Sequence, residues 1–355
     1  MPDKDPESHA EKLSGGEWLI CLGAMALLAL ALPRLWEGAE SWTWGPDSRL
    51  PQSLSEDYRL FSRACEMAAR DKKTALLGDS VIWGEYVEAK ETLAQDLNIL
   101  MGENRFANLG LDGAHPAALA GLFHVHGSAL RGLKVLLHLD PLWMSSPQRD
   151  LGAEETQTFN HPRLVPQFWP RIPCYREVVS RKIGIVMERS SALSGWVRHI
   201  QLSCFDKMDI PAWSLDHPYE NPLGRLKALG NLDTATSEKE TLPWTQRGIE
   251  VQNFPWLDLD SSIQWSFFRG ALEELLARGN CVFVLLGPFN ESMLTAQSLE
   301  RYRKVKTGME GWLKKKGLPF LSPPALESSL YADASHPLAE GYARIAKSLA
   351  EQPFF

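Results

Sequence analysis

The sequence lacks the usual marks of a metal site, a nucleotide site and a nucleic-acid-binding surface. Its five cysteines include no C-x-x-C pair, so a zinc site is not indicated. No glycine-rich phosphate loop and no G-x-G-x-x-G motif follows a predicted strand, and we therefore expect no cofactor. The formal net charge of −7 over 355 residues gives no reason to expect nucleic acid as a partner.

Long apolar runs are scarce too, and one stands out near the start of the chain. Residues 18–32 read WLICLGAMALLALAL without a charge, and extension to 36 approaches the roughly 20 residues that span a bilayer. Trp18 and Trp36 would then lie at the two membrane interfaces. We expect an uncleaved transmembrane anchor over 18–36, after a tail over 1–17, with the remaining chain outside the cytoplasm (periplasmic or extracellular).

Two alternatives to an anchor remain for this segment. A cleaved signal peptide fits the A-x-A pattern of Ala29 and Ala31, and a buried helix of a soluble fold fits the apolar run alone. Against cleavage, the preceding residues include only Lys4 and Lys12 among several acids, whereas signal peptides favour a basic start. The stretch over 37–56 is rich in Gly, Pro, Ser and Trp without a clear period, which is typical of a tether.

From residue 57 to the end, short apolar runs alternate with helical patterns. This alternation is typical of a doubly wound, flavodoxin-like parallel sheet of about five strands, and we predict an α/β domain over 57–355. The predicted strands are 74–77, 105–109, 133–139, 281–286 and 319–321. The predicted helices are 81–101, 116–130, 263–277, 300–316 and a final one that begins at Pro337.

A long insertion, at about 145–260, interrupts this alternation. It is too long for a simple loop, and we expect either a lid subdomain over the active site or a surface that docks a partner. It contains a predicted amphipathic helix over 177–202, whose basic residues indicate a solvated face or, as a sharper alternative, a contact with lipid headgroups or glycans. Cys174 and Cys204 both lie in the insertion and would pair only in an oxidising compartment.

A serine in the motif LLGDSVIWG is the candidate nucleophile. Ser80 comes directly after the first predicted strand, at the edge of a parallel sheet where ligands bind. Gly78 allows a sharp turn there, and the amides at the start of the following helix favour a developing anion. A serine hydroxyl is a poor nucleophile alone and needs a base within hydrogen-bond reach.

The motif DASHPLAEGY near the carboxyl terminus supplies the candidate base. His336 lies at the edge of the last predicted helix, a position that disfavours the protonated ring. Asp333 is three residues earlier, close enough to orient the imidazole and stabilise its transient charge. A lone Gly-Asp-Ser is often only a turn, and a lone Asp-x-x-His is often only a cap. Their combination at these two places predicts a catalytic triad.

These motifs resemble those of the GDSL/SGNH hydrolase family. Gly78-Asp79-Ser80 is similar to the family's first block, Asn108-Leu-Gly-Leu-Asp-Gly113 to its second, and Asp333-x-x-His336 to its last. The resemblance covers roughly 74–140 and 281–350. It implies an oxyanion hole formed by the backbone amides of Ser80 and Gly113.

The third block of the family does not match. The resemblance implies an asparagine after the third strand, whereas this chain has Asp140-Pro141-Leu142-Trp143. Asn290, after the fourth strand, is the candidate substitute, although asparagine is also a common turn residue there. The candidate substrate contacts flank these motifs, with loop or cap roles as their alternatives, and they are Asp79, Asp112, His115 and Asp140.

The resemblance implies acyl transfer through an ester on Ser80, by an esterase or by an O-acyltransferase. An anchor, an insertion and an altered third block are similar to membrane-tethered SGNH-like proteins that acylate cell-surface polymers. That comparison implies an acyl-ester, glycan or lipid substrate and a multi-spanning membrane partner that delivers the acyl group. The alternative, favoured by the missing asparagine, is a catalytically weak module for binding or assembly in a surface-polysaccharide complex.

Overall fold

The computed structural model describes residues 13–40, 45, 47–228 and 241–355. Part of the predicted tail, over 1–12, and residues 41–44 and 46 of the predicted tether lie outside these described residues. The core is a parallel sheet in the order β2-β1-β3-β4-β5, which confirms the predicted doubly wound fold. Its strands are β1 (Thr74–Gly78), β2 (Phe106–Gly110), β3 (Lys134–Leu139), β4 (Cys281–Leu286) and β5 (Phe320–Leu321).

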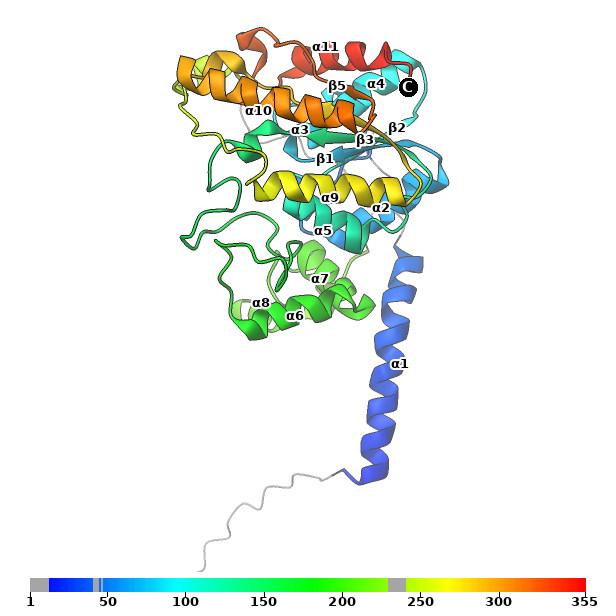
Figure 1. Cartoon of the computed structure of the whole chain (residues 1–355). Coiled ribbons are helices and arrows are strands. Elements are labelled where there is room, and N and C mark those ends of the chain that lie inside the picture. The colour runs from blue at the N-terminus through cyan, green and yellow to red at the C-terminus, as the bar shows by residue number, and fades with distance from the viewer. Residues whose placement is uncertain (1–12, 41–44, 46, 229–240) are drawn as a thin grey trace, which may run out of the picture.

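Helices cover both faces of the sheet (Figure 1). α2, α5 and α9 lie on one face, and α4 and α11 lie on the other. The helices are α1 (Gly15–Ala39), α2 (Tyr58–Arg70), α3 (Ser80–Trp83), α4 (Leu93–Met101), α5 (Pro116–His126), α6 (Val179–Arg189), α7 (Ala192–Cys204), α8 (Ile210–Asp216), α9 (Ile263–Ala277), α10 (Ala296–Lys315) and α11 (Ala339–Ala350).

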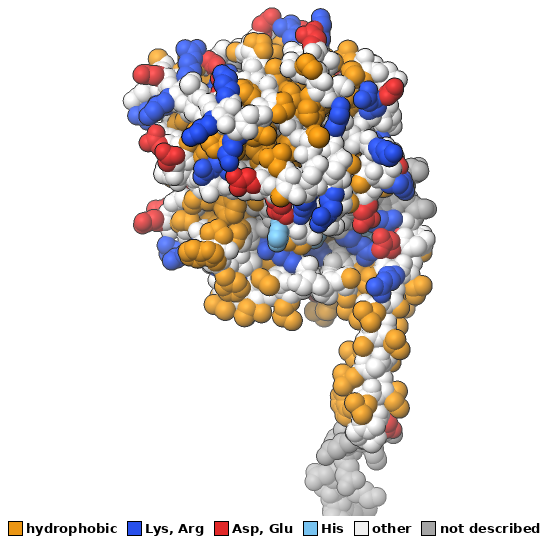
Figure 2. Space-filling view, turned by 45° about the vertical axis from the view of Figure 1, so that its right-hand side comes forward, with side chains coloured by type: hydrophobic (Ala, Val, Ile, Leu, Met, Phe, Trp, Pro, Cys, Tyr) orange, Lys and Arg blue, Asp and Glu red, His pale blue; other side chains and the backbone are white. Residues whose placement is uncertain are grey.

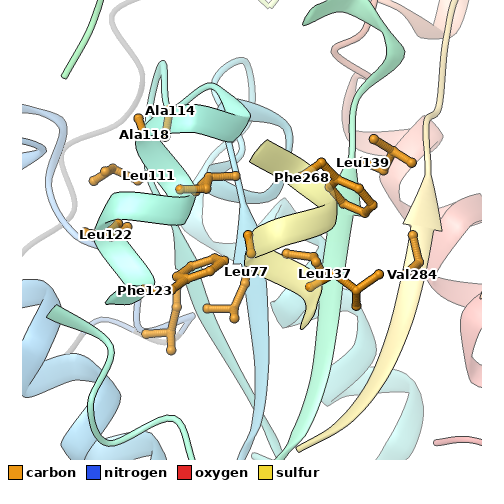
Figure 3. Close-up of a cluster of buried hydrophobic side chains, with 14 of the residues drawn as sticks. Leu77, Leu111, Ala114, Ala118, Leu122, Phe123, Leu137, Leu139, Phe268 and Val284 are labelled. Carbon is orange, nitrogen blue, oxygen red and sulfur yellow. The ribbon is translucent and has the colours of Figure 1, made fainter. Parts of the chain in front are cut away.

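The central strands are apolar because both of their faces are buried. Leu77 and Leu137 point from β1 and β3 into a cluster that also receives Phe123 of α5 and Phe268 of α9 (Figure 3). Leu76 points to the opposite face, where it joins side chains of α4 and α11. The sheet is therefore fixed from both sides, which holds the loops at its carboxyl edge in place.

The helix predicted over 81–101 is broken in the structure. Gly84, with a φ of +87°, ends α3 after four residues, and Thr92 caps a new helix, α4, by accepting the amide of Gln95. A left-handed residue cannot continue an α-helix, so the apolar spacing that links the two halves was misleading. The break returns Glu85 and its neighbours to the carboxyl edge of the sheet.

α1 is long and apolar enough to cross a membrane. Its only buried residue is Pro33, so the alternative of a buried core helix is wrong. The predicted tether over 37–56 is in part packed structure. Asp47 and Arg49 are buried, and Arg49 donates to the carbonyl oxygens of Trp83 and Gly84.

The single helix predicted over 177–202 is two helices, α6 and α7, and α8 follows them in the described part of the insertion. Ser191 begins α7 by accepting the amide of Ser194, which separates it from α6. α7 packs against α1 and α2, so the helices of the insertion lie beside α1 (Figure 1). Cys174 and Cys204 are both free, because they lie in two different buried clusters.

Candidate active site

The candidate nucleophile lies at the carboxyl end of β1. Ser80 begins α3, directly after Asp79 caps that helix by accepting the amide of Val81. A Cβ on Gly78 would lie 2.5 Å from Cγ1 of Ile82, so glycine is required where the chain leaves the strand. All strands of the sheet are parallel, and the loops after β2, β3 and β4 therefore begin at the same edge as Ser80.

The three residues of the predicted triad form one chain of hydrogen bonds. Nε2 of His336 lies 2.8 Å from Oγ of Ser80, and its Nδ1 lies 2.8 Å and 2.9 Å from the two carboxylate oxygens of Asp333. Asp333 also accepts the backbone amides of Ser335 and His336, each at 3.0 Å. The Asp-x-x-His spacing thus closes a small loop that fixes the carboxylate before it orients the ring.

Electrostatics in this chain favour the charged form of the ring. Burial lowers the pKa of His336, but the Asp333 carboxylate and the other nearby carboxylates outweigh burial, and the pKa lies above its ordinary value of 6.5. Burial raises the pKa of Asp333, whereas His336 and the two backbone amides lower it, and the result is well below the ordinary value. Asp333 therefore stays ionised while the ring takes up a proton.

Glu85 is a carboxylate at the site that the sequence did not reveal. Its Oε2 lies 3.0 Å from Nε2 of His336, the same nitrogen that contacts Ser80. Its backbone amide donates to the carbonyl oxygen of Ser80 at 3.2 Å. The sequence pattern placed Glu85 inside a continuous helix, and the turn at Gly84 brings it to the site instead. A carboxylate at this position stabilises the protonated ring.

Gly113 lies after β2 and adopts a φ of +68°. A Cβ there would lie 2.2 Å from Nδ2 of Asn160, so the side-chain amide of Asn160 packs directly on Gly113. Asn160 belongs to the insertion and is exposed. The insertion thus brings an amide donor to the place where the predicted oxyanion hole lies. No sequence signal reveals this, because the neighbours are 47 residues apart in a segment without a period.

Asn290, the predicted substitute donor, makes its hydrogen bonds within the protein. Its Nδ2 donates to the carbonyl oxygen of Asp333 at 3.4 Å, and its backbone amide donates to that of Ala334 at 2.8 Å. The side chain is buried, and its Oδ1 has no hydrogen-bond partner among the described residues. These bonds hold the loop that carries Asp333. An oxyanion donor would instead direct its amide toward the substrate.

Asp79 is part of a buried network behind the nucleophile. Its Oδ1 lies 2.9 Å from Nδ1 of His138, and its Oδ2 accepts Nε1–H of Trp143 at 2.9 Å. Burial raises the pKa of Asp79, but His138 and Trp143 outweigh burial and lower it. Trp143 thus occupies the segment where the family resemblance implies an asparagine, and it fixes the residue next to Ser80.

Asp140 lies directly after β3. It accepts the backbone amide of Leu142 at 2.8 Å and begins the short 3₁₀ turn Pro141–Met144. Burial, and then the negative charge of Asp79, raise the pKa of Asp140 to about 6. No hydrogen bond joins its side chain to the triad among the described residues, and its capping role is the one that the structure supports.

Asp112 and His115 both make their bonds within the protein. Asp112 accepts Nε2–H of Gln52 at 2.9 Å, which fixes the loop after β2. Nδ1 of His115 accepts the amide of Ala118 at 3.3 Å, and its Nε2–H donates to the backbone oxygen of Asn160 at 3.1 Å. Burial lowers the pKa of His115 to about 3, so the ring is neutral and holds Asn160 beside Gly113.

The later part of the insertion also contacts the residues around the triad. Arg247 donates to the carbonyl oxygen of Ala332 at 2.9 Å, and its guanidinium lies 4.8 Å from the centre of the Tyr86 ring. The Tyr86 ring in turn meets the His336 ring edge to face, with 5.3 Å between their centres. Asn160 and Arg247, from the two halves of the insertion, therefore both lie beside the site, while α7 packs against α1.

Among the described residues, no group of three or more His, Cys, Asp or Glu side chains is arranged to hold a metal ion. The groups that meet at the site are a serine hydroxyl, an imidazole and carboxylates. A serine hydroxyl in contact with a carboxylate-oriented imidazole is the geometry of an activated nucleophile.

Comparisons with known proteins add little to this geometry. No family model and no curated protein matches the chain. Among solved structures, the chain is similar to a carbohydrate acetylesterase family member from Sinorhizobium meliloti, with 13% sequence identity and a TM-score of 0.33. The match covers 78% of this chain and 95% of that chain. A TM-score this low carries no argument about the function of this chain.

Proposed function

We propose that this protein is a membrane-anchored serine esterase or O-acyltransferase of the SGNH type. The observation that carries the proposal is the continuous hydrogen-bond chain from Ser80 through His336 to Asp333. These residues come from opposite ends of the sequence, and each lies at the carboxyl edge of the sheet. A purely structural role would not require a hydroxyl, an imidazole and an ionised carboxylate in this order.

In the first half-reaction, Oγ of Ser80 attacks the carbonyl carbon of an acyl ester while His336 takes the hydroxyl proton at Nε2. Asp333 stabilises the resulting imidazolium through Nδ1–H. The carbonyl oxygen becomes an oxyanion, and its donors are the amides of Ser80 and Gly113 with Nδ2 of Asn160. The ester C–O bond then breaks, and the imidazolium gives its proton to the leaving alcohol.

The second half-reaction decides between the two activities. His336 removes a proton from water or from an acceptor hydroxyl, whose oxygen attacks the acyl carbon. The bond between that carbon and Oγ of Ser80 then breaks, and the imidazolium returns the proton to Oγ. Attack by water is hydrolysis, and attack by a sugar or polymer hydroxyl is transfer. Two separate parts of the insertion lie beside the site, which supports a substrate longer than a simple ester. An ester of a cell-surface glycan or lipid fits such a site on a membrane-anchored protein.

The site faces away from the cytoplasm in this proposal, and a multi-spanning membrane protein is the proposed source of acyl groups for transfer. The test uses the full chain in detergent with p-nitrophenyl acetate, with and without oligosaccharide acceptors. We expect ester cleavage that Ser80→Ala abolishes, and an acylated acceptor if transfer is the activity. Equal rates for wild type and Ser80→Ala would contradict the proposal.

A further inference from the structure

Helix α6 carries its apolar residues on the outside. The exposed residues of one arc are Val179, Ile183, Val186 and Met187, and the exposed fractions of their side chains reach 63% and 67% at the two ends. Their spacing of i, i+4, i+7 and i+8 places them on one side of the helix. The only buried residue of α6 is Ile185, so this apolar arc does not face the protein.

More apolar side chains are exposed in the same insertion. Phe168 and Trp169 lie in the loop before α6, with Trp169 86% exposed. Tyr175 fixes that loop to α6. Nζ of Lys182 in α6 lies 4.8 Å from the centre of the Tyr175 ring, and the Tyr175 hydroxyl donates to Gln167 in the loop. Figure 2 shows apolar side chains gathered along the edge of the body from which α1 emerges. Single exposed apolar residues need no explanation, but a contiguous group does.

The position of α6 relative to α1 follows from a cavity that both helices line. A cavity of about 810 Å³ is lined by Ala29, Leu30 and Pro33 of α1 on one side, and by Ile185 and Arg189 of α6 on another. Residues 29–33 belong to the last apolar turns of the predicted span. If the apolar part of α1 fills the hydrocarbon layer, α6 lies at the level of the adjacent membrane interface.

The junction between anchor and insertion is held by several contacts. His199 of α7 lies 3.1 Å from Glu40, directly after α1, and 2.7 Å from Asp57 at the start of α2. The rings of Trp36 and Trp196 meet edge to face, with 6.1 Å between their centres. These contacts fix the direction of α1 relative to the insertion. Insertion of α1 therefore sets the depth of α6 relative to the bilayer.

We propose that α6 is an interfacial membrane helix, which lies in the bilayer surface with Ile183 and Met187 among the lipid chains. The partner of this surface is the lipid bilayer, because α6 and the last apolar turns of α1 line the same cavity and the arc of α6 is exposed. The charged side of α6 suits this orientation, since Arg181 is 67% exposed and lies on the opposite arc. The inference rests on the proposed membrane insertion of α1, but it does not depend on the catalytic activity.

The test places a nitroxide label at single cysteines of the full chain in liposomes and measures its collisions with oxygen and with a water-soluble nickel complex. Cys21 and Cys281, which are exposed, are first changed to Ser, whereas the other three cysteines are buried. The labelled variants are Ile183→Cys and Met187→Cys on the apolar arc. Arg181→Cys is the control on the same helix, and Met25→Cys reports on the anchor itself.

We expect the oxygen-to-nickel collision ratio at 183 and 187 to exceed that at 181 by about tenfold, with a high ratio at 25 as well. A high ratio at 25 and a low ratio at 183 and 187 would overturn the inference and leave the anchor in place. Low collision rates with both reagents at 183 would mean that protein covers the face, which also overturns it. A low ratio at 25 would show that α1 is not inserted, and the inference would fall with the anchor. Ester cleavage by the same variants reports separately on the proposed function.

Discussion

Oγ of Ser80 and Nε2 of His336 lie 2.8 Å apart, although 256 residues separate them in the sequence. The sheet holds one partner at the end of β1, and the loop before α11 holds the other. The hydroxyl of Tyr342 in α11 donates to the carbonyl oxygen of Val81 in α3 at 2.6 Å, which ties the two elements together. The contact between nucleophile and base is thus a consequence of the whole fold.

The pH dependence of ester cleavage tests the environment of His336. The ring must be neutral to accept the serine proton, and its pKa lies above 6.5. We therefore expect activity to rise with pH and to reach half its maximum above pH 6.5. The Glu85 carboxylate, 3.0 Å from Nε2, favours the protonated ring. Glu85→Gln removes that charge, so the rise should move to lower pH.

The measurement is a profile of kcat/KM against pH for the wild type and for Glu85→Gln. Glu88→Gln is the control, because that carboxylate pairs with Lys90 on the surface instead of with the ring. We expect the control to keep the wild-type profile. A midpoint below 6.5 in the wild type, or a Glu85→Gln profile without a shift, would contradict this account of the site.

The two asparagines near the site should respond differently to substitution. Asn160 packs on Gly113 and is exposed, so Asn160→Ala should leave the melting temperature unchanged. If its amide stabilises the oxyanion, kcat falls by about 10²-fold, as for loss of one such donor elsewhere. Rate measurements and thermal melts on the same preparation check both parts, and an unchanged kcat would remove Asn160 from the oxyanion hole.

Asn290→Ala is the matched comparison. Asn290 is 1% exposed and holds the loop of Asp333 by its side chain and its backbone. Loss of the side-chain bond and of buried volume should lower the free energy of unfolding by about 1–3 kcal/mol. The expected result is a lower melting temperature, measured by scanning calorimetry. A loss of kcat with an unchanged melting temperature would restore Asn290 as a direct donor.

The junction at His199 predicts a pH-dependent stability. Burial lowers the pKa of His199, but bonds to Asp57 and Glu40 outweigh it and raise the pKa to about 9. A histidine with a raised folded-state pKa stabilises the fold below its unfolded pKa of about 6.5. That contribution, about 3 kcal/mol from the difference between 6.5 and 9, is lost as the pH rises through about 9.

Thermal melts of the full chain between pH 6 and 10 measure this effect. We expect the melting temperature to fall over the upper part of this range, and to fall much less in His199→Ala. His124→Ala is the control, because its side chain is 76% exposed and should leave the pH dependence unchanged. A parallel pH dependence in wild type and His199→Ala would show that the junction is not held by a charged histidine.

The fold and the contacts among Ser80, His336 and Asp333 could be predicted from the sequence because both follow local rules. Apolar runs of five or six residues indicated β1 and β4, the motif around Ser80 follows β1 directly, and the motif around His336 comes just before α11. A parallel sheet brings strand ends together whatever lies between them. The contact between two distant motifs could therefore be inferred without knowledge of the insertion.

The remaining parts of the site depend on tertiary contacts without a sequence period. Glu85 reaches the ring only because Gly84 ends α3, and the apolar spacing across that break indicated a continuous helix. Asn160 and Arg247 come from the insertion, where no pattern shows which residues return to the sheet. The buried Arg49 likewise lies in a stretch whose composition indicated a tether, because composition does not show which backbone carbonyls a guanidinium will meet.

The central claim is that Ser80 is an activated nucleophile, and a fluorophosphonate probe tests it most directly. The full chain in detergent is labelled beside Ser80→Ala, His336→Ala and the surface control Ser261→Ala, with the modified peptide identified by mass spectrometry. The account predicts labelling at Ser80 in the wild type and in Ser261→Ala, and loss of labelling in the other two. A folded wild-type protein that does not react, or reacts equally after Ser80→Ala, would contradict it.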